Sequence, residues 1–249
     1  MYVVGYPKSG NTWLCFLLAY CLNAEYDDVD APGVHPKNEY QRRYVKGGLD
    51  HPSYQDQVGQ ILKTHCQGGE LAPSSEPLAY LIRDGRDVMV SYYFFHRAYF
   101  NPRNFSFAKR YLVKTRNLVR QSFKATDSEA DFSLFLRQHT DEWVSHVTTW
   151  LKRHPTAIIR YENLKAIPNQ TLQDVFAELG VEVAPATVQQ ALEIFDFKQL
   201  AKRKEGEEDR SSFFRKGIVG DWQNHFSPAD LEFFESKAAS VMQQVGYEL

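Results

Sequence analysis

The first 22 residues constrain the fold more than any other part of the sequence, because a short apolar segment leads through a turn into a long apolar segment. Residues 2–4 predict a buried strand, and the run from Thr12 to Leu22 predicts a helix inside the fold. The turn between them, from Gly5 to Gly10, places backbone N–H groups at the start of that helix. Such groups bind anions, although an ordinary turn would have a similar composition. The opening therefore predicts an α/β fold with a candidate anion site.

Alternating strand and helix patterns continue along the chain. Further strands are predicted at 60–64, 78–82 and 157–160, and helices at about 85–98, 131–152, 169–179, 187–201 and 228–245. This alternation is typical of a three-layer α/β fold with a mostly parallel central sheet flanked by helices. Ligands bind to such sheets beyond the carboxyl ends of the strands. The residues that follow each strand are therefore the candidates for function.

The length of the chain and its polar segments suggest how it is organised. With 249 residues it has the size of one large domain, and we expect a single domain over 1–249. Two polar segments, 23–59 and 202–210, are expected to be mobile loops or lids. For the second, which is highly charged, a solvated surface loop is the simpler interpretation.

Composition excludes several classes of partner. The formal net charge of -2 gives no overall attraction for nucleic acid or an anionic membrane, so an anionic ligand needs a local group of cations. The three cysteines have no Cys-x-x-Cys spacing, which predicts neither a disulfide framework nor a metal site and suits a reducing compartment. The run from Trp13 to Leu22 is too short to cross a bilayer. We expect a cytoplasmic protein without a membrane anchor.

The turn itself carries the string Tyr-Pro-Lys-Ser-Gly-Asn-Thr-Trp at 6–13. It is not a Walker A loop, because Asn11 and not a lysine follows Gly10. The string closely resembles the 5′-phosphosulfate-binding loop of sulfotransferases that use 3′-phosphoadenosine-5′-phosphosulfate (PAPS), which implies a P-loop-like fold. Many cytosolic members carry Thr at the position of Asn11. The resemblance implies binding of the 5′-phosphate by Lys8, Ser9, Gly10, Asn11 and Thr12, with Trp13 near the adenine.

Two further cationic segments resemble parts of the same family. Residues 83–91, Arg-Asp-Gly-Arg-Asp-Val-Met-Val-Ser, follow the predicted strand 78–82 and resemble the 3′-phosphate-binding motif. Residues 215–222, Arg-Lys-Gly-Ile-Val-Gly-Asp-Trp, resemble the element that closes over that phosphate. Either segment alone would fit a solvated surface feature. The resemblance implies that the 3′-phosphate is held by Arg83, Ser91, Arg215, Lys216 and Gly217.

Two aromatic residues are candidates for the adenine pocket. Tyr161 follows the predicted strand 157–160 and matches the family's Tyr-Glu-Asp/Asn-Leu segment. Phe197 matches a position that packs on the base, and ordinary packing in a helix core is the alternative. Trp222 is expected to be a packing residue.

The candidate catalytic residues lie at the end of the predicted strand 60–64. The string Lys-Thr-His at 63–65 resembles the family motif whose histidine is the catalytic base. By that resemblance His65 takes a proton from the acceptor, while Lys8 and Lys63 stabilise the charge that develops during in-line transfer. A structural histidine is the alternative. The resemblance requires no metal ion.

The acceptor is expected to be a small molecule that offers a hydroxyl or an amine. The aromatic residues 92–95 favour a flat or apolar acceptor, but helix packing would explain them equally well. The family's dimerisation segment is not matched after Trp222, so the oligomeric state stays open. Two other functions remain possible. One is a P-loop metabolite kinase, which would need the missing Walker lysine, and the other is an inactive nucleotide-binding module, which would need no base.

Overall fold

The computed structural model describes residues 1–30, 49, 51–72, 75–100 and 130–249. Within these residues, five strands form one parallel sheet in the order β2-β3-β1-β4-β5. Helices are interspersed with the parallel strands along the chain, which gives the three-layer architecture that the sequence predicts. The strands are β1 (Tyr2–Val4), β2 (Tyr26–Asp28), β3 (Ile61–Thr64), β4 (Leu78–Ile82) and β5 (Ala157–Arg160).

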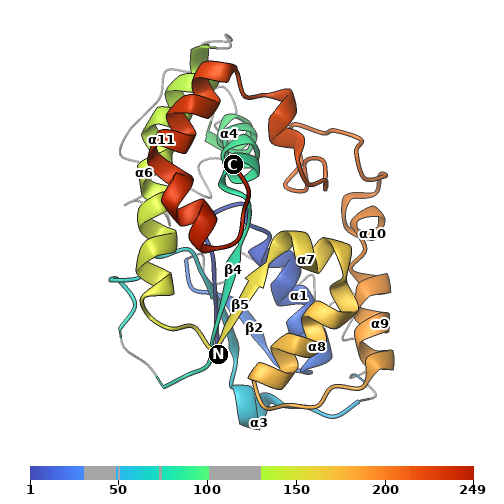
Figure 1. Ribbon diagram of the computed structural model, residues 1–249. Coiled ribbons are helices and arrows are strands. Elements are labelled where there is room, and N and C mark those ends of the chain that lie inside the picture. Colours follow the sequence, from blue (N-terminus) through green and yellow to red (C-terminus); the bar gives the residue numbers. More distant parts are fainter. Residues whose placement is uncertain (31–48, 50, 73–74, 101–129) are drawn as a thin grey trace.

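Helices cover both faces of the sheet (Figure 1). On one face lie α1 (Asn11–Cys21), α7 (Tyr161–Ala166), α8 (Pro168–Glu178) and α9 (Pro185–Ile194). On the other lie α4 (Gly85–Phe100), α6 (Ala130–Leu151) and α11 (Pro228–Gln244). The remaining short helices are α3 (Gln55–Val58), α10 (Phe197–Ala201) and the 3-10 helix η2 (Asp221–Asn224). None of the described helices has the length and apolarity needed to cross a membrane.

The strands divide the core into two main clusters because successive side chains of a strand point to opposite faces. Val3 and Leu81 pack with α1, α8 and α9, whereas Val4 and Tyr80 pack with α4, α6 and α11. Strands buried on both faces are apolar at consecutive positions, which is the pattern of β4. A third cluster joins α4 to α6 through Tyr93, Phe94, Phe132 and Phe135.

The sequence-based boundaries agree closely at most elements, and two expectations were wrong. Segment 23–59 is not only loop, because β2 and α3 lie in it; its residues 31–48 and 50 fall outside the described residues. The predicted helix 187–201 is two helices, α9 and α10. Asp196 separates them because its side chain accepts the backbone N–H of Lys198 and so caps the start of α10.

Candidate active site

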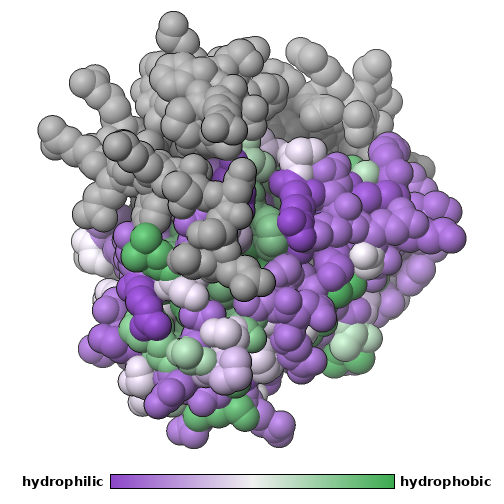
Figure 2. Space-filling model, turned by 90° about the horizontal axis from the view of Figure 1, so that it is seen from above, coloured by the Kyte–Doolittle hydropathy of each residue, from purple (hydrophilic) through white to green (hydrophobic). Residues whose placement is uncertain are grey.

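The loops that follow three neighbouring strands carry the candidate residues. Strand β1 lies between β3 and β4, so the loop after β1 is flanked by His65 after β3 and by Arg83 after β4. Because the strands are parallel, all three loops lie at the edge of the sheet where the strands have their carboxyl ends. Figure 2 shows hydrophilic residues over much of the described surface when the molecule is viewed from above, with small separate apolar patches.

The loop from Gly5 to Trp13 is wound tightly against the start of α1. Gly10 precedes the helix with φ of 107°, and a Cβ atom at this position would lie 2.7 Å from the ring of Tyr161. Both the backbone conformation and the close approach therefore require glycine. The first N–H groups of a helix have no partner within the helix, and its dipole favours negative charge there. The start of α1 is thus suited to an anion.

Lys8 extends into surroundings that hold other cations. Its ammonium lies 3.0 Å from the carbonyl oxygen of Phe213, 3.8 Å from the centre of the Phe213 ring and 4.4 Å from that of Phe95. Burial, and then the positive charges of Arg83 and Arg215, lower the pKa of Lys8 from 10.5 to about 7. An anion bound beside Lys8 would restore the charged form.

His65 is held by both its backbone and its ring. Its N–H donates to Asp30 Oδ2 at 2.6 Å, and its ring Nδ1 lies 2.6 Å from the carbonyl oxygen of Gly5. Burial, and then the charge of Lys63, lower the pKa of His65 well below its usual value. The ring is therefore neutral near pH 7 and can accept a proton.

Lys63 is already paired within the sheet. Its ammonium lies 2.6 Å from Asp28 Oδ2 on β2, and the two side chains are only 4% and 2% exposed. Asp28 and Asp30 together bind the end of β3, since the Thr64 hydroxyl donates to Asp30 Oδ1 at 2.8 Å. No local sequence pattern indicates these two carboxylates, because they lie more than 30 residues before their partners.

Arg83 connects three segments of the site. Its guanidinium lies 4.4 Å from the centre of the Tyr161 ring and donates to the Ile218 carbonyl at 3.1 Å and to Asp87 at 3.4 Å. Ser91, the other candidate of this motif, is partly buried in the second turn of α4. A guanidinium fixed in this way keeps a defined orientation toward a phosphate.

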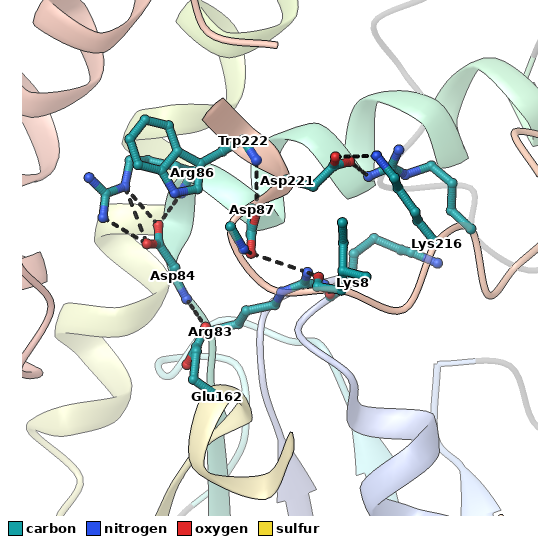
Figure 3. A network of polar contacts seen from close by, with 12 residues as sticks. Lys8, Arg83, Asp84, Arg86, Asp87, Glu162, Lys216, Asp221 and Trp222 are labelled. Atoms are coloured by element: carbon teal, nitrogen blue, oxygen red, sulfur yellow. Dashed lines mark hydrogen bonds and ion pairs between the residues drawn. The ribbon is translucent and has the colours of Figure 1, made fainter. Parts of the chain in front are cut away.

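The cations of the C-terminal loop are paired with acids (Figure 3). Arg215 donates to Glu208 and to Asp221, and Lys216 donates to Asp221 at 2.5 Å. Burial alone would raise the pKa of Asp221, but the hydrogen bonds from Lys216 and Arg215 outweigh it and lower that pKa. Gly217 has φ of 73°, and a Cβ there would lie 2.5 Å from the Phe197 ring.

Asp87 fastens this loop to α4, and sequence reasoning missed it. Its carboxylate accepts the backbone N–H groups of Gly220 at 2.8 Å and Trp222 at 3.0 Å (Figure 3). Trp222 is a packing residue, as expected, with the guanidinium of Arg86 at 4.2 Å from its ring. The neighbouring Asp84 accepts from Arg86 at 2.8 Å. Sequence spacing could suggest the contact of Asp87 with Arg83, but not the longer-range contacts.

The charged run 202–210 is largely exposed, as a solvated surface loop should be, and its backbone also contacts the C-terminal loop. The backbone N–H of Gly206 donates to the Lys216 carbonyl, and that of Asp209 donates to the Arg215 carbonyl, both at 2.9 Å. Arg203 also donates to the Arg215 carbonyl at 2.8 Å. The run therefore supports the two cations.

The aromatic candidates lie beside these cations. Trp13 and Tyr161 form an edge-to-face pair with centroids 6.1 Å apart, and Tyr161 also packs on Gly10. Phe197 begins α10 and contacts Gly217, and it is part of neither core cluster that covers the sheet. The structure thus places the following predicted residues around one region: Lys8, Gly10, Trp13, His65, Arg83, Tyr161, Phe197, Arg215, Lys216 and Gly217.

Comparisons with known proteins agree with this arrangement. A family model described as "Sulfotransferase domain" matches residues 1–246. Sulfotransferase 1A1 of Bos taurus is 26% identical over 95% of this chain and 81% of its own length. Sulfotransferase 2A1 of Homo sapiens is 25% identical over 99% of this chain and 85% of its own length.

Solved structures show the same fold. Mouse sulfotransferase SULT7A1, crystallised with PAP, has a TM-score of 0.65 and 21% identity, covering 97% of this chain and 83% of that chain. Retinol dehydratase, crystallised with androsterone and the inactive cofactor PAP, has a TM-score of 0.60 and 20% identity, covering 100% and 81%. Since the family model spans nearly all of the sequence and these structures share its fold, the chain belongs to the sulfotransferase family.

Proposed function

We propose that this chain transfers the sulfuryl group of PAPS to a hydroxyl or amine of a small-molecule acceptor and releases 3′,5′-adenosine bisphosphate (PAP). One observation carries the proposal: His65 and Asn11, the first residue of α1, both contact the carbonyl oxygen of Gly5, so the candidate base lies beside the helix start. Arg83 lies at the same end of the parallel strands. An anion site alone would fit many nucleotides. A neutral base beside that site fits the attack of a nucleophile on a nucleotide donor.

The described residues fit an adenosine with two separate phosphate groups. One cationic position lies at the start of α1 with Lys8, and the other is formed by Arg83, Arg215 and Lys216. Aromatic rings lie beside both positions, which suits a purine base. PAPS would supply an activated sulfuryl group. We infer the contacts in three sets: the 5′-phosphate with Lys8, Ser9, Gly10, Asn11 and Thr12; the 3′-phosphate with Arg83, Ser91, Arg215, Lys216 and Gly217; and the adenine with Trp13, Tyr161 and Phe197.

His65, Lys8 and Lys63 have different roles in the proposed transfer. His65 takes the proton of the acceptor at Nε2, because its Nδ1 faces the Gly5 carbonyl. Lys8 stabilises the negative charge that develops on the departing oxygen. A direct role for Lys63 would require its ammonium to leave Asp28, so we assign it the electrostatic role of keeping His65 neutral.

The class of acceptor rests on related proteins. The retinol dehydratase neighbour was crystallised with androsterone, a small apolar molecule, and the chain shares its fold. In this chain, Tyr93 and Phe94 pack in a helix cluster, while Phe95 faces Lys8. A screen of phenols, alcohols and amines with labelled donor would identify the acceptor.

Nucleotide preference tests the donor. Calorimetric titration with PAP, 5′-AMP and ATP with Mg²⁺ should show the tightest binding for PAP. Replacing Arg215 with Gln should reduce the advantage of PAP over 5′-AMP, because only PAP carries the 3′-phosphate. Preference for ATP would overturn the proposal and favour a kinase.

Substitution of the base tests the catalytic role. His65→Ala should lower the rate of sulfuryl transfer by roughly 100- to 10,000-fold while PAP still binds. His154→Asn is the matched control, because His154 is exposed and its positive φ suits Asn. A fully active His65→Ala protein would exclude His65 as the base.

A further inference from the structure

The side chain of Asn11 faces the catalytic histidine, although the sequence places this residue among the nucleotide contacts. Asn11 is the first residue of α1 and is only 3% exposed. Its Nδ2 donates to the Gly5 carbonyl at 2.8 Å and lies 3.0 Å from His65 Nδ1. The same carbonyl oxygen lies 2.6 Å from His65 Nδ1. Gly5 O therefore receives two side chains from different loops.

The Asn11 amide occupies the space that a side chain at residue 5 would need. A Cβ atom on Gly5 would overlap Asn11 Oδ1 and would lie 2.5 Å from the carbonyl oxygen of Leu81. Gly5 is not among the residues with positive φ, so its backbone conformation alone does not require glycine. The missing side chain instead allows the Asn11 amide to lie against the β1 end of the loop.

The hydrogen-bond chemistry of this group selects one form of the imidazole. A carbonyl oxygen has two lone pairs and can accept from both Asn11 Nδ2 and His65 Nδ1. The contact of 2.6 Å between Gly5 O and Nδ1 is favourable only when Nδ1 carries the proton. Asn11 Nδ2 is also a donor, so in this form it bonds to Gly5 O and makes no hydrogen bond to the ring nitrogen 3.0 Å away. The lone pair of the neutral ring then lies on Nε2, where a base could accept the proton of an acceptor.

We propose that Asn11 is a positioning residue for the general base: its amide fixes the Gly5 carbonyl, and that carbonyl holds the His65 ring with its proton on Nδ1 and its lone pair on Nε2. The inference rests on the proposed function, because it assigns Asn11 a role in a reaction whose base is His65. It separates the Asn11 side chain from the phosphate contacts, which the backbone of the loop would make. The buried Asn11 Oδ1 has no hydrogen-bond partner among the described residues, so the position of the amide is explained by its contact with Gly5 O.

Other charged groups surround His65 and affect its titration. Lys63, Lys8 and His146 lower the pKa of His65 electrostatically, after burial, and the Gly5 carbonyl opposes them. Asp30 accepts the backbone N–H of His65. A substitution of Asn11 leaves all of these groups in place, so its effect on His65 can be measured separately from theirs.

A double-mutant cycle tests the inference. Asn11→Leu, which keeps the approximate volume but removes the donor, should lower the rate of sulfuryl transfer at saturating donor by up to roughly 100-fold. The dissociation constant of PAP should change less than threefold. In a His65→Ala background, Asn11→Leu should have no further effect on the rate, because Asn11 acts through the ring. An equal loss in both backgrounds, or a loss of PAP binding that matches the loss of rate, would overturn the inference.

Nitrogen NMR of the His65 ring gives a readout that does not depend on activity. In the parent protein, Nδ1 should carry the proton, and in Asn11→Leu the two tautomers should become mixed. Asn11→Asp provides a second variant of similar shape, and its carboxylate should raise the pKa of His65 by roughly one unit. The Nδ1–H tautomer should persist in Asn11→Asp, because a carboxylate accepts from Nδ1–H, whereas an unchanged tautomer in Asn11→Leu would contradict the positioning role.

These outcomes are distinct from failure of the proposed function. If His65→Ala is fully active, His65 is not the base, whatever the NMR spectra show. If His65→Ala is inactive while Asn11→Leu keeps the rate and the tautomer of the parent, the proposed function stands and only the role of Asn11 is lost.

Discussion

The two loops that supply cations to the site differ in whether those cations are paired with acidic side chains. In the N-terminal loop, residues 5–13, the described contacts of the Lys8 ammonium are a carbonyl oxygen and two aromatic rings. In the C-terminal loop, residues 213–222, Asp221 accepts from both Arg215 and Lys216, and Glu208 accepts from Arg215. One loop thus holds its charge without a carboxylate contact among the described residues, and the other neutralises it.

This difference has consequences for binding and for stability. A charge that is desolvated without a counter-charge shifts its pKa and attracts any anion that enters, as the value of about 7 for Lys8 indicates. A cation that is already paired with an acid stabilises the conformation of its loop. A bound ligand must then compete with that acid for the cation. We therefore expect the first loop to determine reactivity and proton uptake, and the second to determine stability and to modulate affinity.

The largest effect should come from Asp221, the shared acid of the C-terminal loop. Asp221→Asn should lower the free energy of unfolding by about 3–5 kcal/mol, because Lys216 loses its carboxylate partner and Arg215 keeps only Glu208 among the described acids. The lowered pKa of Asp221 means that its contribution is complete above about pH 4 and is lost as the pH falls through its folded value. Denaturant unfolding at several pH values measures both effects. Unchanged stability at pH 7 would contradict the assignment of Asp221 as the structural acid.

Lys8 should show the reverse pattern, with a large effect on rate and no loss of stability. Lys8→Met should lower the rate of sulfuryl transfer by roughly 100- to 1,000-fold, because a cation beside the departing oxygen is removed. Stability at pH 7 should not fall, because in the folded parent the ammonium is desolvated and has no carboxylate contact in the described structure. Single-turnover rates and thermal unfolding measure the two quantities. Lys237→Met is the control, because Lys237 lies on α11 and its side chain is 45% exposed.

Proton uptake on binding sharpens the same contrast. A phosphate beside Lys8 raises the pKa of the ammonium from about 7, so PAP binding at pH 8 should take up a proton and its affinity should fall by up to about tenfold per pH unit above pH 7. In the free protein, stability should rise with pH between about 7 and 10.5, because the unfolded chain binds more protons there. Calorimetry in buffers of different ionisation enthalpy measures the uptake. The uptake should be largely lost in Lys8→Met, and its persistence would assign it to another group.

The smallest effect should come from Glu208, which competes with a ligand for Arg215. Glu208→Gln should tighten PAP binding by roughly three- to tenfold and change stability by less than about 1 kcal/mol, because this carboxylate is 26% exposed. Titrations at two salt concentrations measure the gain, which should shrink at high salt. Glu207→Gln is the matched control, since it removes a charge from the same run without a described contact to Arg215. Equal gains in both variants would indicate a general charge effect.

Much of the fold could be predicted where the signal is local. The apolar runs of β1, β4 and β5, and the turn before α1, fix the positions of Lys8, Arg83 and Tyr161 relative to the sheet edge. Strand β2 could not be predicted, because Tyr26-Asp27-Asp28 is not an apolar strand sequence. Its pairing with β3 and the ion pair of Asp28 with Lys63 stabilise it, and both depend on a segment 35 residues away.

The sequence alone determined the α/β order, the tight loop before α1 and the family, because strand and helix periods and the motif strings depend on residues that are neighbours along the chain. Tertiary structure decided which charges are paired, that Asn11 faces His65, and that run 202–210 supports Arg215 and Lys216. Desolvation and hydrogen bonding depend on distances in space between segments far apart in sequence, and those distances are set only when the sheet and its two helical layers pack together.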